Sequence, residues 1–459
     1  MKEKKQIKGE KGTAALAITV TVCTLFLLIL LLVTVILTSA TSGILNSTSP
    51  LDPSVLLSEE ESSAASIKDS IIPAFIGIGT EESRKGISAG DNVVRELYAL
   101  LTPYLVNGLC TEPERVESFV WKEAISTYPY VFVQYHSPMP IEFLQATGAQ
   151  KEEEMAVGEN TLLAESLLLK PGFAGSMLLL VKITDGTVLR YSCDSGNREE
   201  FPTMDTLSEW VQNFPNNFYR YELRFDGMKT EPVFLERIRV QNVTMAAGSL
   251  EMLESNDAQM GRFLRLLDFN PDKLSKHTES DGTSVLVESH GILQYCENWY
   301  RYIASSDGGV PISSVIGNQD YYTVYDIIRT ACTIAERLRN ASQYYLGGEA
   351  ELVLTSCETT GDTVTLTFSY AFDNLLISEY DPALVLTVSD TYRILSLQIT
   401  SIAVTGWGEY RTVYTESGIH DQNDGKNKSV FLTYPSDFYA EAVFPVWTVC
   451  TPVDVQTGE

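Results

Sequence analysis

One uncharged stretch constrains this chain more than any other feature of its sequence. Residues 14–37 run for 24 positions without a charge and consist mainly of Leu, Ile and Val. A helix needs about 20 such residues to cross a bilayer. A cleavable secretory signal has an apolar core of only about 7 to 15 residues. The stretch therefore predicts an uncleaved transmembrane anchor.

The charges that flank this stretch predict its orientation. Five lysines precede it within residues 1–13, whereas the first charge after it is Asp52. Positively charged residues tend to stay on the cytoplasmic side of a membrane. We therefore expect a single-pass protein of the cell membrane, with a cytoplasmic tail at 1–13, an anchor at 14–37 and an extracytoplasmic remainder.

The part that follows the anchor is strongly acidic. Of the 33 basic and 60 acidic residues, five and two precede the anchor, so the remainder carries a formal charge of −30. Such a surface repels nucleic acid, which excludes it as a partner. The Ser- and Thr-rich segment 38–66 predicts a flexible linker. The rest exceeds one typical domain, and we divide it into two α+β regions, 67–248 and 249–459.

Hydrophobic spacing predicts helices and strands in a recurring order. Apolar residues recur every three or four positions in the helical segments and alternate with polar ones in the strands. Helices are expected at residues 91–105, 113–125, 206–214, 257–267 and 324–338. Strands are expected at residues 130–135, 177–183, 187–193, 219–225, 234–240, 284–288, 292–295, 364–370, 384–388 and 394–399. This order indicates an α+β fold of antiparallel sheets with helices packed on one face.

The common catalytic motifs are missing from the sequence. It has no His-Glu-x-x-His zinc motif, no Gly-x-Ser-x-Gly elbow and no phosphate loop. Residues 77–79 (Gly-Ile-Gly) begin like a dinucleotide-binding loop, but Glu82 replaces the third glycine and would repel a pyrophosphate. Residues 420–425 resemble a calcium loop, yet His420 replaces its first acid and Phe431 its last. We therefore predict no enzymatic activity, no metal and no cofactor.

The cysteines leave two alternatives open. Six follow the anchor at wide spacing, so disulfides are permitted, although buried thiols are favoured. Cys357 ends a β-like run that resembles the nucleophile strand of sortases, with His290 upstream and Arg393 downstream. The helix expected at 324–338 does not suit a sortase barrel, and Glu358 disfavours a thiolate. We expect a packed thiol and keep a sortase-like cysteine transpeptidase as an alternative.

Two blocks in the last part of the chain carry a family resemblance. The first comprises Asn270-Pro271, His277-Thr278-Glu279, Asp281-Gly282-Thr283 and Val285-Leu286-Val287-Glu288. The second is the aromatic run Phe368-Ser369-Tyr370-Ala371-Phe372-Asp373-Asn374. They are similar to a hairpin and to an aromatic strand of the YycH/YycI proteins. In that family the second block usually continues Gly, apolar, Pro, apolar, whereas Leu375, Leu376 and Ile377 follow here.

The resemblance covers roughly residues 263–400, together with the anchor and the overall layout. It implies a non-enzymatic regulator of Gram-positive bacteria that restrains a WalK-type sensor histidine kinase of a two-component system. The implied partners are a membrane sensor kinase or a homologous regulator. The alternative is an extracytoplasmic cell-wall or ligand-binding module.

The anchor itself carries a candidate partner-binding face. Helices in lipid associate through close packing, which small residues four positions apart permit. Ala15, Thr19 and Cys23 form such a row near the cytoplasmic end of the anchor. We predict that this row packs against a partner helix.

Overall fold

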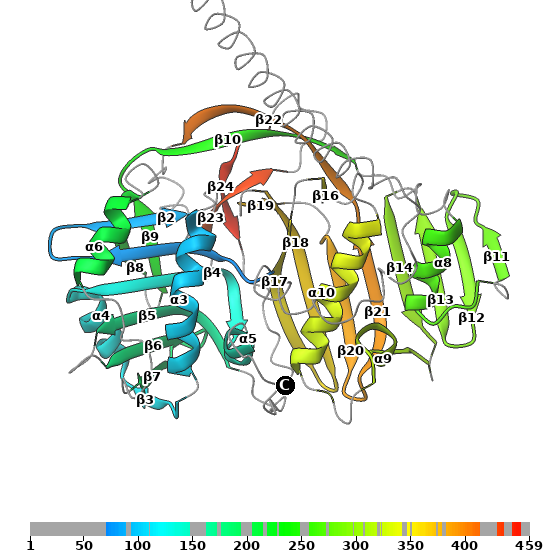
Figure 1. Cartoon of the computed structure of the whole chain (residues 1–459), viewed down its shortest axis with the longest axis horizontal. Coiled ribbons are helices and arrows are strands. Elements are labelled where there is room, and N and C mark those ends of the chain that lie inside the picture. The colour runs from blue at the N-terminus through cyan, green and yellow to red at the C-terminus, as the bar shows by residue number, and fades with distance from the viewer. Residues whose placement is uncertain are drawn as a thin grey trace, which may run out of the picture. The chain divides into compact units, whose positions relative to one another are not determined.

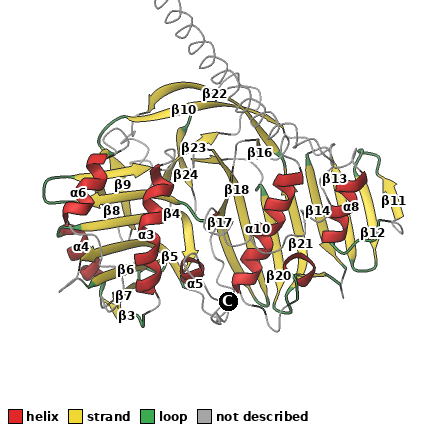
Figure 2. Cartoon of the chain, in the orientation of Figure 1, coloured by secondary structure: helices red, strands yellow, loops and turns green. Residues whose placement is uncertain are grey.

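Two large, mainly antiparallel sheets and the helices that pack on them make up most of the computed structural model (Figures 1 and 2). It describes residues 70–88, 93–109, 111–146, 162–171, 176–193, 204–213, 218–226, 229–247, 257–271, 275–296, 298–305, 308–318, 322, 324–341, 347–348, 351–372, 375–378, 382–413, 429–435 and 443–450. The α+β class is confirmed. Among these residues no helix is both long and apolar enough to span a bilayer, and the predicted anchor lies outside them.

The first sheet has nine strands in the order β3-β7-β6-β5-β4-β1-β2-β8-β9. Their bounds are β1 Pro73–Gly79, β2 Arg84–Ser88, β3 Glu114–Val116, β4 Tyr130–Pro140, β5 Leu163–Pro171, β6 Met177–Ile183, β7 Val188–Cys193, β8 Tyr219–Asp226 and β9 Lys229–Phe234. The associated helices are α3 Val93–Leu109, α4 Ser118–Ser126, α5 Ile141–Ala146 and α6 Met204–Asn213.

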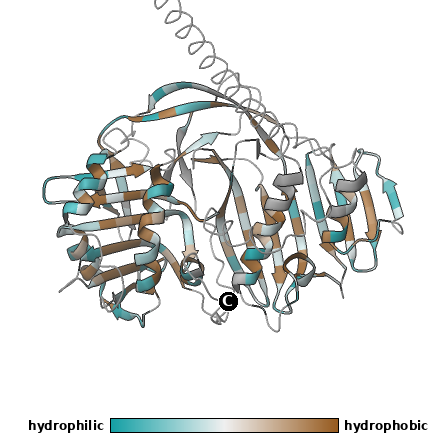
Figure 3. Cartoon of the chain, in the orientation of Figure 1, coloured by the Kyte–Doolittle hydropathy of each residue, from teal (hydrophilic) through white to brown (hydrophobic). Residues whose placement is uncertain are grey.

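Both faces of the nine-stranded sheet are buried. Helix α3 packs with one set of alternate side chains, which includes Leu179. Helix α4 packs with the other set through Trp121, against Leu180. Strands that are buried on two faces read as continuous apolar runs, as in Met177–Ile183. Figure 3 shows long hydrophobic stretches along these strands.

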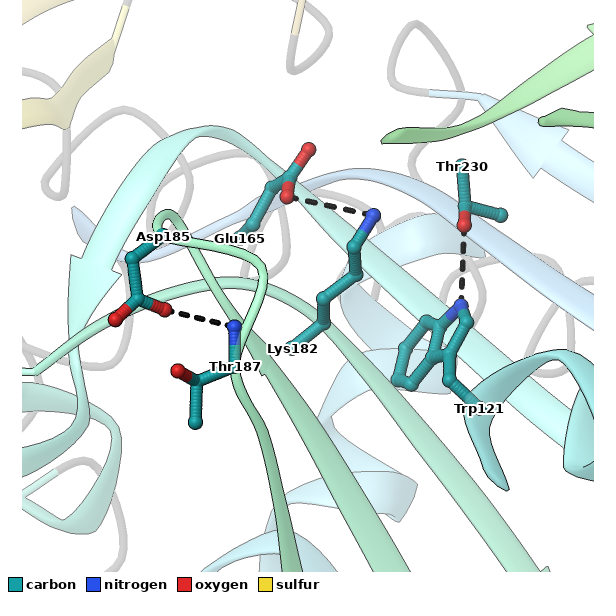
Figure 4. Close-up of polar contacts among 6 residues, drawn as sticks. All are labelled: Trp121, Glu165, Lys182, Asp185, Thr187 and Thr230. Atoms are coloured by element: carbon teal, nitrogen blue, oxygen red, sulfur yellow. Dashed lines mark hydrogen bonds and ion pairs between the residues drawn. The ribbon is translucent and has the colours of Figure 1, made fainter. Parts of the chain in front are cut away.

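Two polar side chains inside this sheet contact partners within the sheet and its helices (Figure 4). Trp121 Nε1 donates to Thr230 Oγ1 at 3.0 Å, with both residues buried. Lys182 Nζ lies 3.6 Å from Glu165 Oε2, and the lysine side chain is only 4% exposed. Pairing of this kind is what allows a charge to be buried.

The second sheet has twelve strands, ten of them in the order β11-β12-β13-β14-β21-β20-β18-β19-β23-β24, with β15 on β21 and β17 on β18. Their bounds are β11 Ser275–Thr278, β12 Ser284–Glu288, β13 Gly291–Cys296, β14 Trp299–Ala304, β15 Val310–Pro311, β17 Glu351–Thr360, β18 Thr363–Phe372, β19 Leu375–Ser378, β20 Leu384–Ser389, β21 Arg393–Thr400, β23 Ser429–Pro435 and β24 Val446–Cys450. Its helices are α8 Asp257–Leu266, α9 Ser313–Ile316 and α10 Val324–Ala341.

Helix α10 covers one face of this sheet (Figure 1). Its stripe of Ile327, Ile328, Ala331 and Ile334 packs with the buried alternate residues of β18, β20 and β21. The intervening residues of these strands are mostly Thr and Ser and remain partly exposed. This alternation is typical of a sheet that is buried on one face only.

A third sheet joins distant parts of the sequence. Strand β10 (Ile238–Ala247) pairs with β22 (Ile402–Val413) in antiparallel register, and β16 (Gly347–Gly348) adds a short parallel contact. The predicted boundary at residue 248 falls just after β10 and stays a prediction, as does the division into domains.

The structure corrects three expectations. The helix predicted at 113–125 begins only at Ser118, because Glu114–Val116 pairs with β7 as strand β3. The strand predicted at 234–240 is two strands, β9 and β10, separated at the exposed Leu235. The prediction that helices pack on one face of each sheet fits the twelve-stranded sheet only, because α3 and α4 cover opposite faces of the nine-stranded sheet.

Candidate functional site

The candidate site is the face of the twelve-stranded sheet that is turned away from α10. Two neighbouring rows of side chains cross eight strands there, from β17 through β18, β20, β21, β14, β13 and β12 to β11. The first row is Glu358, Thr365, Thr387, Ser396, Ile303, Ile292, Val287 and Ser275. The second row is Ser356, Thr367, Val385, Gln398, Arg301, Gln294, Val285 and His277. We call these sixteen residues, of which only Val285 is buried, the open face.

Hydroxyl groups dominate the half of the open face formed by β17, β18, β20 and β21. Thr365 Oγ1 and Thr387 Oγ1 lie 3.2 Å apart and share a hydrogen bond across two strands. Ser356 Oγ donates to Glu358 Oε1 at 3.2 Å. Because a hydroxyl has one donor and two acceptor positions, such groups can still bond to an external ligand.

In the other half, formed by β14, β13, β12 and β11, apolar side chains predominate in the first row. Val287, Ile292 and Ile303 are direct cross-strand neighbours on β12, β13 and β14. They are 40%, 40% and 38% exposed. We call these three residues the apolar trio. Single exposed apolar residues need no explanation, whereas a contiguous group of them is a candidate contact surface for another molecule.

The open face is neutral at pH 7 in a chain of net charge −27. It contains one acid, Glu358, and one formally charged base, Arg301. A second acidic protein would be repelled over most of this chain and least over such a face. The open face can therefore make hydrogen bonds and apolar contacts with little electrostatic penalty.

The structure places Cys357 far from the other two residues of the sortase-like alternative. Cys357 lies on β17, and five strand spacings of about 4.8 Å, roughly 24 Å in all, separate β17 from β13 and the adjacent His290. Burial, reinforced by Glu142 and Glu358, raises the pKa of the Cys357 thiol to about 12. The thiol is 8% exposed, so the prediction that it is packed is confirmed.

His290 and Arg393 do meet, but in a structural loop. The carbonyl oxygen of His290 accepts from the Gly309 amide at 3.2 Å, and Arg393 Nε donates to the Gly308 carbonyl at 3.4 Å. The ring nitrogen Nε2 of His290 lies 3.0 Å from the Leu267 carbonyl oxygen. The contacts with Gly308 and Gly309 fix the loop between β14 and β15, and the contact with Leu267 joins His290 to the end of α8.

Other predicted positions lie outside the described residues or belong to secondary structure. Ala15, Thr19 and Cys23 are outside, as is the calcium-like segment 420–425. Residues 77–79 lie in strand β1 rather than in a nucleotide-binding loop. Within the described part of the chain, no group of three potential ligands is placed to hold a metal ion.

Comparisons with known proteins do not assign this chain to a family. No family model matches it, and no curated protein matches it. One solved structure is similar to it, that of an uncharacterized protein from Eubacterium rectale ATCC 33656, with a TM-score of 0.31 and 14% identity over 48% of this chain and 80% of that chain. A likeness of this degree carries no argument about fold or function.

The apolar trio was missed at the level of sequence, although one signal was present. Strand β12 has apolar residues at three consecutive positions, Val285, Leu286 and Val287. Only alternate side chains point to the same face of a strand, so such a run places an apolar residue on the polar side. That Val287 meets Ile292 and Ile303 depends on strand register, which the sequence does not show.

Proposed function

We propose that the chain is a non-enzymatic, membrane-anchored extracytoplasmic adaptor that binds the ectodomain of a membrane sensor kinase or of a homologous regulator on its open face. The apolar trio is the observation that carries the proposal. The uncharged segment 14–37 supports the anchor. The resemblance to the YycH/YycI proteins supports the choice of partner and a role in two-component regulation.

The open face fits a protein partner of defined chemistry. Its apolar half matches a small apolar patch, and its hydroxyl half matches backbone or side-chain amides and hydroxyls. Full burial of a Val or Ile side chain is worth about 1.5–3 kcal/mol. Covering the exposed two-fifths of each residue of the trio would then contribute about 1.8–3.6 kcal/mol in total, or roughly 20- to 400-fold in Kd.

The test replaces the apolar trio by Thr in the full-length chain (V287T/I292T/I303T). Threonine keeps β propensity, so the strands should persist while the apolar patch is lost. The chain is co-expressed in membranes with a WalK-type sensor kinase from the same organism, and co-purification and kinase autophosphorylation are measured. We expect the wild type to bind and restrain the kinase, and the triple variant to bind at least about tenfold less.

The matched control is Leu235→Thr, which replaces an apolar residue that is 49% exposed outside the open face. It should bind as the wild type does. A triple variant that binds equally well would reject the open face as the docking surface. A wild-type chain that neither binds nor restrains the kinase would reject the adaptor.

A second candidate function is extracytoplasmic ligand binding. It is favoured by a cluster of one arginine and three tyrosines at the end of the nine-stranded sheet, which is independent of the open face.

A further inference from the structure

Arginine and tyrosine side chains converge at one end of the nine-stranded sheet. Gly79 at the end of β1 pairs with Arg84 of β2 on one side and with Tyr130 of β4 on the other. The three residues therefore form a row on the face that α4 covers. A Cβ atom at Gly79 would collide with the Tyr130 ring, so the glycine lets that ring lie over the β1 backbone.

Two more tyrosines complete the cluster. The ring of Tyr128 stacks on Tyr130 at 5.8 Å between centroids, and the guanidinium carbon of Arg84 lies 5.6 Å from the Tyr128 centroid. Tyr221 lies beside Arg84, because Lys85 pairs with Arg220 in antiparallel register. The Tyr221 hydroxyl donates to the Tyr130 hydroxyl at 3.3 Å. We call Arg84, Tyr128, Tyr130 and Tyr221 the Arg–Tyr cluster.

The cluster has more hydrogen-bond donors than acceptors. Burial raises the pKa of both Tyr130 and Tyr221, so both phenols stay protonated at neutral pH. Tyr130 accepts the bond from Tyr221, and the two tyrosines, 0% and 1% exposed, form the buried floor of the cluster. Among the described residues, no carboxylate forms an ion pair with Arg84, and its buried Nε has no acceptor. Because Nε is itself out of reach of solvent, an external anion would bind the terminal nitrogens of the guanidinium, whose charge has no acidic partner among the described residues.

The cluster is reached from the surface at Arg84, which is half-buried, and at Tyr128, which is 37% exposed. The acids nearest in sequence, Glu81 and Glu82, are exposed in the turn before β2. A ligand there would contact the guanidinium of Arg84 and the aromatic ring of Tyr128. The planar guanidinium matches oxyanions with two acceptor oxygens.

We infer that the Arg–Tyr cluster is a binding site for an organic carboxylate that places an aromatic or apolar group against Tyr128. The carboxylate oxygens accept from the guanidinium of Arg84, and the apolar group covers the exposed ring of Tyr128. A singly charged carboxylate is preferred to a doubly charged phosphate, because the chain carries a net charge of −27 and repels anions in proportion to their charge. This inference does not rest on the adaptor proposal.

The test uses the full-length chain in nanodiscs of zwitterionic lipid, with benzoate as the probe and calorimetric titration as the measurement. Three further compounds serve as controls. Acetate lacks the aromatic group that would contact Tyr128, and benzyl alcohol lacks the negative charge. Inorganic phosphate tests whether a singly charged anion is preferred. We expect binding in the order benzoate, acetate, phosphate, with none for benzyl alcohol. Binding should weaken with salt, because part of it is electrostatic.

Substitution assigns the site. Arg84→Gln should weaken benzoate at least about tenfold. Lys85→Gln is the matched control: it removes one charge from the same strand, but Lys85 pairs with Ile78 and faces the opposite side of the sheet. It should change binding by less than about twofold. Equal losses in the two variants would show a general charge effect and overturn the site.

Tyr128→Ala is a second variant, needed if Arg84→Gln does not fold. Because Tyr128 is partly exposed to solvent, its replacement should leave the fold intact. It should weaken benzoate but leave acetate almost unchanged. Unchanged benzoate binding in Tyr128→Ala, tighter binding of phosphate than of benzoate, or no benzoate binding by the wild type would each overturn the inference. None of these results would bear on the kinase experiment.

Discussion

The two large sheets of this protein use the same kind of strand in opposite ways. In the nine-stranded sheet, both sets of alternate side chains are buried, and polar groups such as Lys182 and Trp121 are satisfied internally. In the twelve-stranded sheet, one set is buried against α8 and α10, and the other forms the open face. The comparison shows where a broad docking surface is available: a sheet that must bury both faces for stability can bind a ligand only at its ends or edges.

Truncation of matched aliphatic residues should give the largest difference between the sheets. Leu180→Ala removes a side chain that is 0% exposed on the α4 face and should cost about 3–4 kcal/mol of unfolding free energy. Ile292→Ala removes one that is 40% exposed on the open face and should cost about 1 kcal/mol. Thermal or denaturant unfolding of the full-length variants measures both. Equal costs would mean that the open face is part of a core.

The buried ion pair offers a second way to break the comparison. Lys182→Met leaves Glu165 without its cation in a buried setting and should cost about 3 kcal/mol. The double variant K182M/E165L should recover most of that loss, because it leaves no buried charge. Unfolding of the single and double variants gives the coupling energy. A double variant as unstable as the single one would show that the lysine matters for something other than this pair.

The alkylation rates of two cysteines compare the two faces of the twelve-stranded sheet, and the expected difference is smaller than those above. Cys357 pairs with Leu366 and belongs to the buried side, whereas Cys296 is only partly buried. Alkylation of the folded chain near neutral pH should modify Cys357 at least about tenfold more slowly than Cys296. Mass spectrometry of the two peptides measures the ratio, and faster labelling of Cys357 would revive the sortase-like alternative.

The raised pKa of Cys357 also determines whether the free energy of unfolding rises or falls with pH. The pKa of the Cys357 thiol is about 12 in the folded chain, whereas its ordinary value is 9.0. As the pH rises between these two values, the unfolded chain therefore loses the thiol proton before the folded chain does. Stability from this group is therefore fully present below about pH 9 and falls as the pH rises toward 12.

Local sequence signals predicted much of the fold. The β6–β7 hairpin follows from Asp185-Gly186: Gly186 adopts a φ of 84°, and Asp185 Oδ1 accepts from the Thr187 amide at 2.7 Å. The alternation in β18, β20 and β21 and the stripe of α10 were equally clear. Each of these signals depends on residues that are close in sequence.

The remaining features depend on contacts between distant residues. Strands β1 and β2 were not predicted, since their glycines are complemented by rings from elsewhere: Tyr221 lies against Gly77, and Phe75 against Gly86. Strand β3 exists because β7 pairs with it. For the same reason neither the open face nor the Arg–Tyr cluster could be predicted, because each brings together residues from several strands.

The pairing of β10 with β22 sets a minimum time that must pass during synthesis before the third sheet can form. The paired residues Ala247 and Ile402 are 155 positions apart. A ribosome that adds about 5–20 residues per second needs roughly 8–30 s to supply the second strand after the first. Throughout that interval β10 lacks its β22 partner, so a nascent chain passes through a stage in which the edge of this strand is open to wrong partners.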